Sequence, residues 1–452
     1  MQLHCRYAWV AGRWQSDVCI ESDSSGWINK ISNLETFRTT PTPQNDEPIE
    51  YVDGAVLPAM TNVHSHAFQW GFAGLSEFRS AEHDSFWTWR THMFGFLEQL
   101  DADTMYAVAC DLYRRMLRAG YCAVGEFHYV HTPPDGGLYS PPSLLSEVLI
   151  QAAIDTGISI CMLPTLYQRG GFDGSPLVGG QRRFYLDEAD FFRVLDNLLA
   201  RYGDQPRVNF GMALHSLRAV DVHVGQRVVN QFRQLIPHGV IHIHAAEQTQ
   251  EVDDCMAATG KRPVELLLDE FPVDEQWCLI HATQMTDDEV ARLASRRAVV
   301  GLCPTTEANL GDGIFAAESF LMKHGGRIAI GGDSHVGINV AAELRQLECS
   351  QRLVSRRRAV LCSSTQSCGE TLYDATSRGG AQALGLPIGE IAIGKRADFL
   401  MLLKEPNAAA ADPSRTQNEL PGNQPARWLD RFIFCDPTPI QHRVMIGGRW
   451  LG

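Results

Sequence analysis

Eight short apolar runs recur through the middle of this chain and constrain its fold more than any other feature. The segments between them carry helix signals, and the runs begin near residues 56, 122, 158, 208, 240, 277, 298 and 327. After the first run, for example, Val108, Leu112 and Met116 recur at helical spacing, with Asp103 as the expected cap. Eight alternating strand and helix units in sequence predict a closed, parallel (β/α)8 TIM barrel over residues 56–385.

The two chain ends have a different texture from the middle. Short alternating segments such as YAWVAGRW near the start and HRVMIGGRWLG at the end are broken by Gly, Pro and Asn, which is typical of β-hairpins. We therefore predict an α/β protein in which residues 1–55 and 386–452 together form a small β-sandwich domain beside the barrel. A chain of 452 residues is long enough for both parts.

Composition narrows the class of protein. An apolar content of 44% with 20% charged residues is typical of a globular protein. The net charge of −14 argues against partners such as nucleic acid or an anionic membrane surface. The chain shows neither a signal-peptide pattern nor an apolar run long enough to span a bilayer. Its 12 cysteines lack any C-x-x-C spacing and suit a reducing compartment, so we expect a cytoplasmic protein.

Three of the apolar runs are followed by or end in residues that can bind a metal ion. His64 and His66 are two apart after the first run, so both imidazoles point to the same side of a strand. His244 ends the fifth run and Asp333 follows the eighth. Nitrogen and oxygen ligands without a thiolate cage suit one divalent ion that keeps an open position for water. His242 is a rival ligand on the same strand face as His244, but we expect it to lie one layer deeper, in the packing.

Further residues at predicted strand ends have the chemistry for catalysis and binding. Glu247 follows His244 by three residues and His281 ends the sixth run, where either could move protons at a water molecule. Without the other candidate site residues, either one would be interpreted as an ordinary polar residue of the surface or the core. Two arginines aimed into one cavity would bind carboxylates through paired hydrogen bonds, so an anionic small molecule is the expected substrate. The candidate substrate-binding residues are Gln69, Arg90, Tyr129, His215 and Arg218.

The motifs H-S-H, H-A-A-E, L-I-H-A and G-G-D-S-H resemble those of the amidohydrolase superfamily, and the resemblance covers nearly the whole chain. His215 stands where the binuclear members carry a lysine, which favours a single metal ion. Longer motifs, including HSHAFQWGFAGL, DSFWTWR, GEFHYVH, HIHAAEQTQEVDDC and TEANLGDGIF, resemble the subgroup of N-formimino-L-glutamate deiminases. These are iminohydrolases of histidine degradation.

The resemblance implies hydrolysis of N-formimino-L-glutamate to N-formyl-L-glutamate and ammonia, with one Zn2+ per chain and a homodimeric assembly. It implies that Glu247 carries a proton from water to the leaving nitrogen while His281 polarises the reacting carbon. Asp333 would bind the metal and share in proton removal. Two alternatives stay open. One is a metal-dependent deaminase of a neutral purine or pyrimidine ring, and the other is a non-catalytic barrel that serves as a scaffold.

Overall fold

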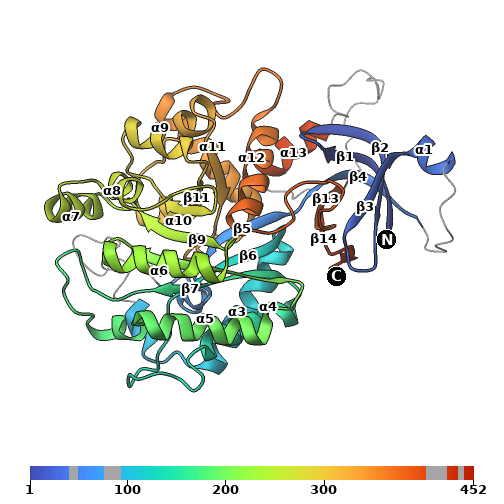
Figure 1. Ribbon diagram of the computed structural model, residues 1–452. Coiled ribbons are helices and arrows are strands. Elements are labelled where there is room, and N and C mark those ends of the chain that lie inside the picture. Colours follow the sequence, from blue (N-terminus) through green and yellow to red (C-terminus); the bar gives the residue numbers. More distant parts are fainter. Residues whose placement is uncertain (40–48, 76–92, 404–424, 436–441, 452) are drawn as a thin grey trace.

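Eight parallel strands form the centre of the computed structural model, which describes residues 1–39, 49–75, 93–403, 425–435 and 442–451 (Figure 1). Each strand pairs with the next one along the chain. The first and last strands also meet, because the backbone N–H of Asp333 donates to the carbonyl oxygen of His64 at 2.9 Å. The sheet is therefore closed as predicted, and its strands are β5 (Met60–Ser65), β6 (Tyr121–His128), β7 (Ser159–Leu166), β8 (Val208–Ser216), β9 (Val240–Ala245), β10 (Trp277–His281), β11 (Val299–Leu302) and β12 (Arg327–Ile330).

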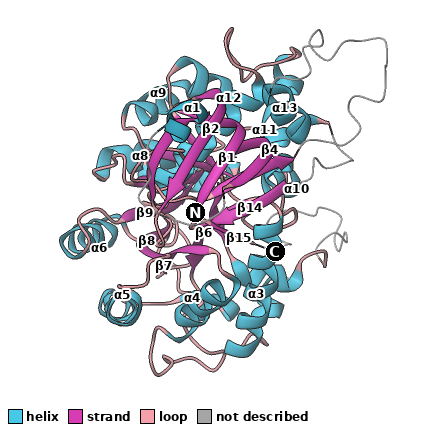
Figure 2. Cartoon of the chain, turned by 90° about the vertical axis from the view of Figure 1, so that its right-hand side faces the viewer, coloured by secondary structure: helices cyan, strands magenta, loops and turns pink. Residues whose placement is uncertain are grey.

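Helices surround these strands on the outside (Figure 2). The α-helices are α3 (Ala102–Arg118), α4 (Leu144–Thr156), α5 (Glu188–Tyr202), α6 (Val222–Leu235), α7 (Thr249–Thr259), α8 (Pro263–Glu270), α9 (Asp287–Ser295), α10 (Pro304–Leu310), α11 (Val340–Ser355) and α12 (Cys368–Ala383). Shorter helical turns are η1 (Ala67–Phe72), η2 (Gly179–Phe184) and η3 (Glu318–Lys323). The cap of α3 is Asp101, whose side chain accepts from the backbone N–H of Thr104, so the expected cap at Asp103 is wrong by two residues. No helix in the described ranges is both long and apolar enough to cross a membrane.

Both chain ends contribute to a second sheet, which lies to one side of the barrel together with the two termini (Figure 1). Its strands are β1 (Gln2–Val10), β2 (Arg13–Ser22), β3 (Ile28–Asn33), β4 (Glu50–Pro58), β13 (Phe399–Leu403), β14 (His442–Ile446) and β15 (Arg449–Trp450). Helices α1 (Leu34–Thr39) and α13 (Pro425–Phe434) accompany it. Where the sequence predicted a sandwich, these seven strands are hydrogen-bonded in one sheet, in which only β1 and β4 pair in parallel.

The second sheet is buried on both faces over part of its area. In β4, Val52 and Val56 pack into a core of its own, whereas Ala55 and Leu57 belong to the core of the barrel. This alternation follows the period of two along a strand. The sheet therefore joins the barrel through an apolar interface rather than through a linker.

The first apolar run divides between the two sheets. Residues up to Pro58 belong to β4, and the first barrel strand starts only at Met60. The expectation that the first barrel strand begins near residue 56 is therefore wrong. Because both faces of β4 are buried, the run of apolar residues continues across Ala59. The sequence therefore does not indicate where β4 ends and β5 begins.

Helix α12 lies close against the junction of the first and last barrel strands. A Cβ atom at Gly379 would lie 2.0 Å from the carbonyl oxygen of Ile328, and one at Gly380 would lie 1.9 Å from Thr61 Oγ1. Both distances are far below a van der Waals contact. Two glycines are therefore required for the helix backbone to approach β12 and β5 this closely.

Candidate metal centre and active site

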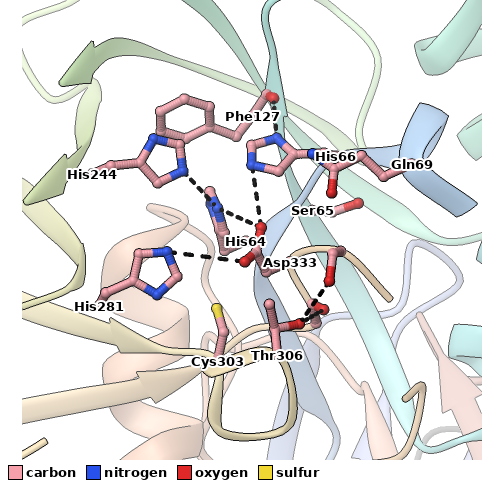
Figure 3. A network of polar contacts seen from close by, with 12 residues as sticks. His64, Ser65, His66, Gln69, Phe127, His244, His281, Cys303, Thr306 and Asp333 are labelled. Atoms are coloured by element: carbon pink, nitrogen blue, oxygen red, sulfur yellow. Dashed lines mark hydrogen bonds and ion pairs between the residues drawn. The ribbon is translucent and has the colours of Figure 1, made fainter. Parts of the chain in front are cut away.

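The metal-ligand candidates start at the carboxyl end of β5. His64 lies within the strand, and His66 follows the end of the strand, directly before η1. The turn between strand and helix is fixed by Glu126 of β6, whose carboxylate accepts from Ser65 Oγ and from the backbone N–H of Ala67, both at 2.7 Å. Burial raises the pKa of Glu126 to about 7. This buried carboxylate holds the chain so that both histidine rings point into the mouth of the barrel (Figure 3).

Strands β9 and β12 bring the other two predicted ligands to the same place (Figure 3). The Nε2 atoms of His64 and His244 are 3.0 Å apart. Asp333 Oδ1 lies 3.4 Å from His64 Nε2 and 3.3 Å from His66 Nε2. The four side chains are at most 9% exposed. The structure thus places all four predicted ligands in one buried cluster.

Hydrogen bonds behind two of the rings set which nitrogen faces the cluster. His66 Nδ1 donates to the carbonyl oxygen of Phe127, and His244 Nδ1 donates to that of His215, both at 2.8 Å. Burial lowers the pKa of both imidazoles, and that of His64 as well, so the rings are neutral. Each Nε2 of His66 and His244 therefore presents a lone pair to the cluster. Imidazole nitrogens with free lone pairs, close together and beside a carboxylate, can bind a divalent cation such as Zn2+. The backbone carbonyl groups behind the imidazoles fix the orientation of the rings.

His281 and Glu247 lie next to this cluster. His281 Nε2 is 3.7 Å from Glu247 Oε1 and 3.9 Å from Asp333 Oδ2. Burial raises the pKa of Glu247 to about 7. Burial would lower the pKa of His281, but the carboxylates of Glu247, Glu307 and Asp333 raise it well above its ordinary value. The pair of Glu247 and His281 can therefore hold a proton beside the metal-ligand cluster.

The backbone is strained where two of these residues leave their strands. His281 has φ of +69° and Asp333 has φ of +47°, which is the left-handed region that residues other than glycine rarely adopt. Such a conformation costs on the order of 1–3 kcal/mol per residue and is concentrated at functional sites. In both cases the strained residue turns its side chain toward the cluster at the end of the strand.

A cavity opens next to the cluster, and it contains the predicted substrate-binding residues that the structure describes. Gln69 Nε2 donates to Tyr129 Oη at 3.0 Å, and His215 packs on Tyr167 with ring centroids 4.3 Å apart. Arg90 lies outside the described residues. The cavity is lined by His66, Gln69, Met93, Tyr129, Tyr167, Phe184, His215, Ser216, Arg218, His244, Glu247, Glu251, His281, Leu310 and Asp333.

His242 lies away from this cavity. Its Nε2 bonds to the carbonyl oxygen of Ala383 at 2.8 Å, and the side chain is fully buried. This agrees with the expected packing role one layer below His244.

Several buried carboxylates near the site are absent from the sequence-based prediction. Glu126 fixes the turn after β5, Glu307 contacts His281, and Glu251 lines the cavity. The run CAVGEF offered a signal for Glu126, because a carboxylate inside an apolar strand must have buried partners. Glu251 and Glu307 lie on helices, where the sequence alone does not distinguish them from exposed glutamates.

Comparison with known proteins identifies the family. Residues 55–451 match the model of the amidohydrolase family. The chain is 45% identical over 440 residues to a formimidoylglutamate deiminase from Pseudomonas aeruginosa, which covers 97% of this chain and 91% of the relative. It is 25% identical to a 5-methylthioadenosine/S-adenosylhomocysteine deaminase from Halalkalibacterium halodurans, over 80% of this chain and 76% of the relative.

Solved structures show the same architecture. An amidohydrolase from Brucella melitensis superposes with a TM-score of 0.87 at 38% identity, covering 99% of this chain and 94% of its own. An adenosine deaminase from Xanthomonas campestris with bound zinc gives a TM-score of 0.77 at 20% identity, over 99% and 92% of the two chains. The second likeness shows the fold alone. The barrel fold, the match of residues 55–451 to the family model and the relative of 45% identity agree, and they show that this chain belongs to the amidohydrolase family.

Proposed function

We propose that this enzyme hydrolyses N-formimino-L-glutamate to N-formyl-L-glutamate and ammonia, a step in histidine degradation. The observation that carries the proposal is the 45% identity to a formimidoylglutamate deiminase along nearly the full length of both chains. The cavity supports it, because Arg218 lines the same space as Glu247, His281 and Asp333. A substrate with carboxylates at one end and a reactive carbon–nitrogen bond at the other matches this distribution of charge.

The metal in this proposal is one Zn2+ held by His64, His66, His244 and Asp333. When bound there, zinc would lower the pKa of a coordinated water and so supply a nucleophile at neutral pH. The buried, neutral imidazoles and the carbonyl groups behind them support this ligand set. Cys303 lies close enough to His281 and Asp333 to form another group that could hold a metal, but the proposed ligands are only the three histidines and Asp333.

The residues beside the ligands have the roles that proton transfer requires. The water oxygen forms a bond to the formimino carbon, and the bond from that carbon to its terminal nitrogen breaks. Glu247 takes a proton from the attacking water and delivers it to this nitrogen, which leaves as ammonia. His281, held between Glu247 and Glu307, stabilises the charge that develops at the reacting centre. Asp333 lies within 3.9 Å of His281 and shares in proton removal.

The far side of the cavity would hold the glutamate part of the substrate. Arg218 pairs with a carboxylate, while Gln69, Tyr129 and His215 contribute polar groups and close the wall. Gln69 Oε1 is buried without a hydrogen-bond partner among the described residues, so it can accept from a bound ligand. Arg90 is proposed as the second carboxylate-binding arginine on the basis of the sequence.

A deaminase of a neutral ring is the second candidate. Tyr129, Tyr167 and Phe184 line the cavity and could stack on a purine or pyrimidine.

A single experiment separates the two candidate functions. Zinc-loaded protein is incubated in parallel with N-formimino-L-glutamate, guanine and cytosine, and released ammonia is measured. We expect ammonia to be released only from N-formimino-L-glutamate. Release from guanine or cytosine, without release from N-formimino-L-glutamate, would reject the proposed substrate.

The remaining proposals concern the cellular location and the oligomeric state of the enzyme, and the scaffold alternative. All 12 cysteines are unpaired, which supports a cytoplasmic, reducing location. The resemblance to family members implies a homodimer, which sedimentation analysis would test. The complete ligand cluster argues against a non-catalytic scaffold.

A further inference from the structure

Glu251 is a buried acidic residue of the cavity wall for which the mechanism above has no use. It lies in the first turn of α7, one helical turn after Glu247, and it is 5% exposed. One carboxylate oxygen, Oε2, accepts from the backbone N–H of Glu247 at 3.0 Å. The other, Oε1, is buried and has no hydrogen-bond partner within the described part of the chain. One carboxylate oxygen of a side chain that lines the cavity is therefore left without a partner.

The charges around Glu251 indicate what kind of ligand this is. Burial raises the pKa of its carboxyl group, although Arg218 opposes that shift. The described cavity wall carries three carboxylates, on Glu247, Glu251 and Asp333, beside the guanidinium of Arg218. A ligand with negative charge alone would be repelled by this wall. A ligand that also carries a cationic, hydrogen-bond-donating group would be matched by it.

The substrate of the proposed function has such a group. A formimino group attached to nitrogen is an amidine, which is a strong base and is protonated at neutral pH. Its N–H groups are planar, cationic donors that pair with carboxylate oxygens. The reaction converts it to a neutral formyl amide. Substrate and product therefore share both carboxylates and differ in charge at the reacting end.

We propose that Glu251 is a specificity-determining residue, whose Oε1 accepts a hydrogen bond from the protonated formimino group and so selects an amidinium over a neutral amide. This inference rests on the proposed function. A purely structural role for Glu251 would need only Oε2, which holds the backbone of Glu247 at the start of α7. The unpartnered Oε1 has no purpose in that reading, although its side chain lines the same cavity as Glu247, His281 and Asp333.

The substitution Glu251→Gln tests the inference, because the amide retains an oxygen that can accept from the backbone N–H of Glu247 but removes the negative charge. KM for N-formimino-L-glutamate and the inhibition constant of N-formyl-L-glutamate are measured on the zinc-loaded enzyme. A charge-assisted hydrogen bond is worth enough that KM should rise by about 10- to 100-fold. The inhibition constant of the neutral product should change by less than about twofold to threefold, within ordinary mutational scatter. Asp254→Asn, at an exposed position of the same helix, is the matched control and should change neither value.

Each other result has a distinct meaning. If Glu251→Gln leaves both constants unchanged, Glu251 only caps the helix and the assignment is wrong. If both constants rise equally, the substitution distorts the cavity, which also overturns selection by charge. If the parent enzyme releases no ammonia from N-formimino-L-glutamate, the proposed function fails, and this assignment fails with it.

Discussion

His281 Nδ1 lies 3.2 Å from Oε1 of Glu307, and the same carboxylate oxygen accepts from the backbone N–H of Cys303 at 2.8 Å. Glu307 is on α10, whereas His281 ends β10, so a helix of the outer layer determines how a ring in the active site is oriented. With Nδ1 held in this way, Nε2 is the nitrogen that faces Glu247 and Asp333.

The first prediction follows from this contact. Glu307→Ala should lower kcat by about 10- to 100-fold, the usual effect of removing a partner behind a site residue, with a smaller change in KM. Glu307→Gln keeps an acceptor and should recover part of the loss. Steady-state kinetics of both variants check this, with exposed Glu275→Gln as the control. Unchanged kcat in Glu307→Ala would show that His281 keeps its orientation without Glu307.

A second prediction concerns Glu247. If it transfers protons in the transition state, Glu247→Gln should reduce turnover by roughly 10²- to 10⁴-fold, while bound zinc stays near the parent value. Ammonia release and elemental analysis on the same preparation measure both quantities. Turnover close to that of the parent would eliminate Glu247 as the proton carrier.

The third prediction places substrate affinity at Arg218. Removing one member of a buried charge pair typically costs about 2–5 kcal/mol, so Arg218→Met should sharply lower kcat/KM for N-formimino-L-glutamate with zinc still bound. An analogue that lacks the matching carboxylate should be a poor substrate of the parent and should be little affected by the substitution. Equal losses on both compounds would mean that Arg218 shapes the cavity rather than binds the carboxylate.

Metal content provides the fourth prediction. We expect one zinc per chain by elemental analysis, and Asp333→Ala or His244→Ala should each lower that amount. A chelator should abolish activity and lower the unfolding temperature of the parent, because an ion that binds only the folded state stabilises it. Two tightly bound equivalents, or a full complement of zinc in either variant, would contradict the proposed ligand set.

The fifth prediction concerns packing at α12. Gly380→Ala places a methyl group where Thr61 Oγ1 already lies, at a separation of 1.9 Å. Overpacking of this kind typically destabilises by about 1–3 kcal/mol, which urea-induced unfolding would measure. Gly95→Ala is the control, since no atom lies within 4 Å of the added carbon. Equal midpoints in the two variants would show that α12 can move away from the barrel at little cost.

The sequence predicted the barrel and the convergence of the four candidate metal ligands because both depend on local pattern. His64, His66, His244 and Asp333 each follow an apolar run, and the ends of parallel strands meet at one rim. Their convergence therefore follows from topology alone. The boundary at Ala59 was beyond this reasoning, because β4 is buried on both faces and gives no change of period.

The buried carboxylates on helices could not be predicted from the local sequence pattern either. Whether Glu251 and Glu307 face inward depends on how their helices pack, and only the packed structure shows that both are buried. Among the predicted cavity residues, Gln69, Tyr129, His215 and Arg218 come together, whereas the position of Arg90 lies outside the described ranges. Substrate-binding residues on long loops are in general less predictable than ligands on strands.

The meeting of β5 with β12 has a consequence for the order in which the enzyme can be assembled. His64 lies in the first strand of the barrel and Asp333 follows the last strand, and the hydrogen bond between their backbones closes the barrel. While the chain is being synthesised, the histidine pair leaves the ribosome long before the aspartate. The proposed zinc site is therefore incomplete until the eighth strand has been made and has found the first. Zinc bound there would link the first and the last strand of the closed barrel, and its binding would show that β12 has been made and has paired with β5.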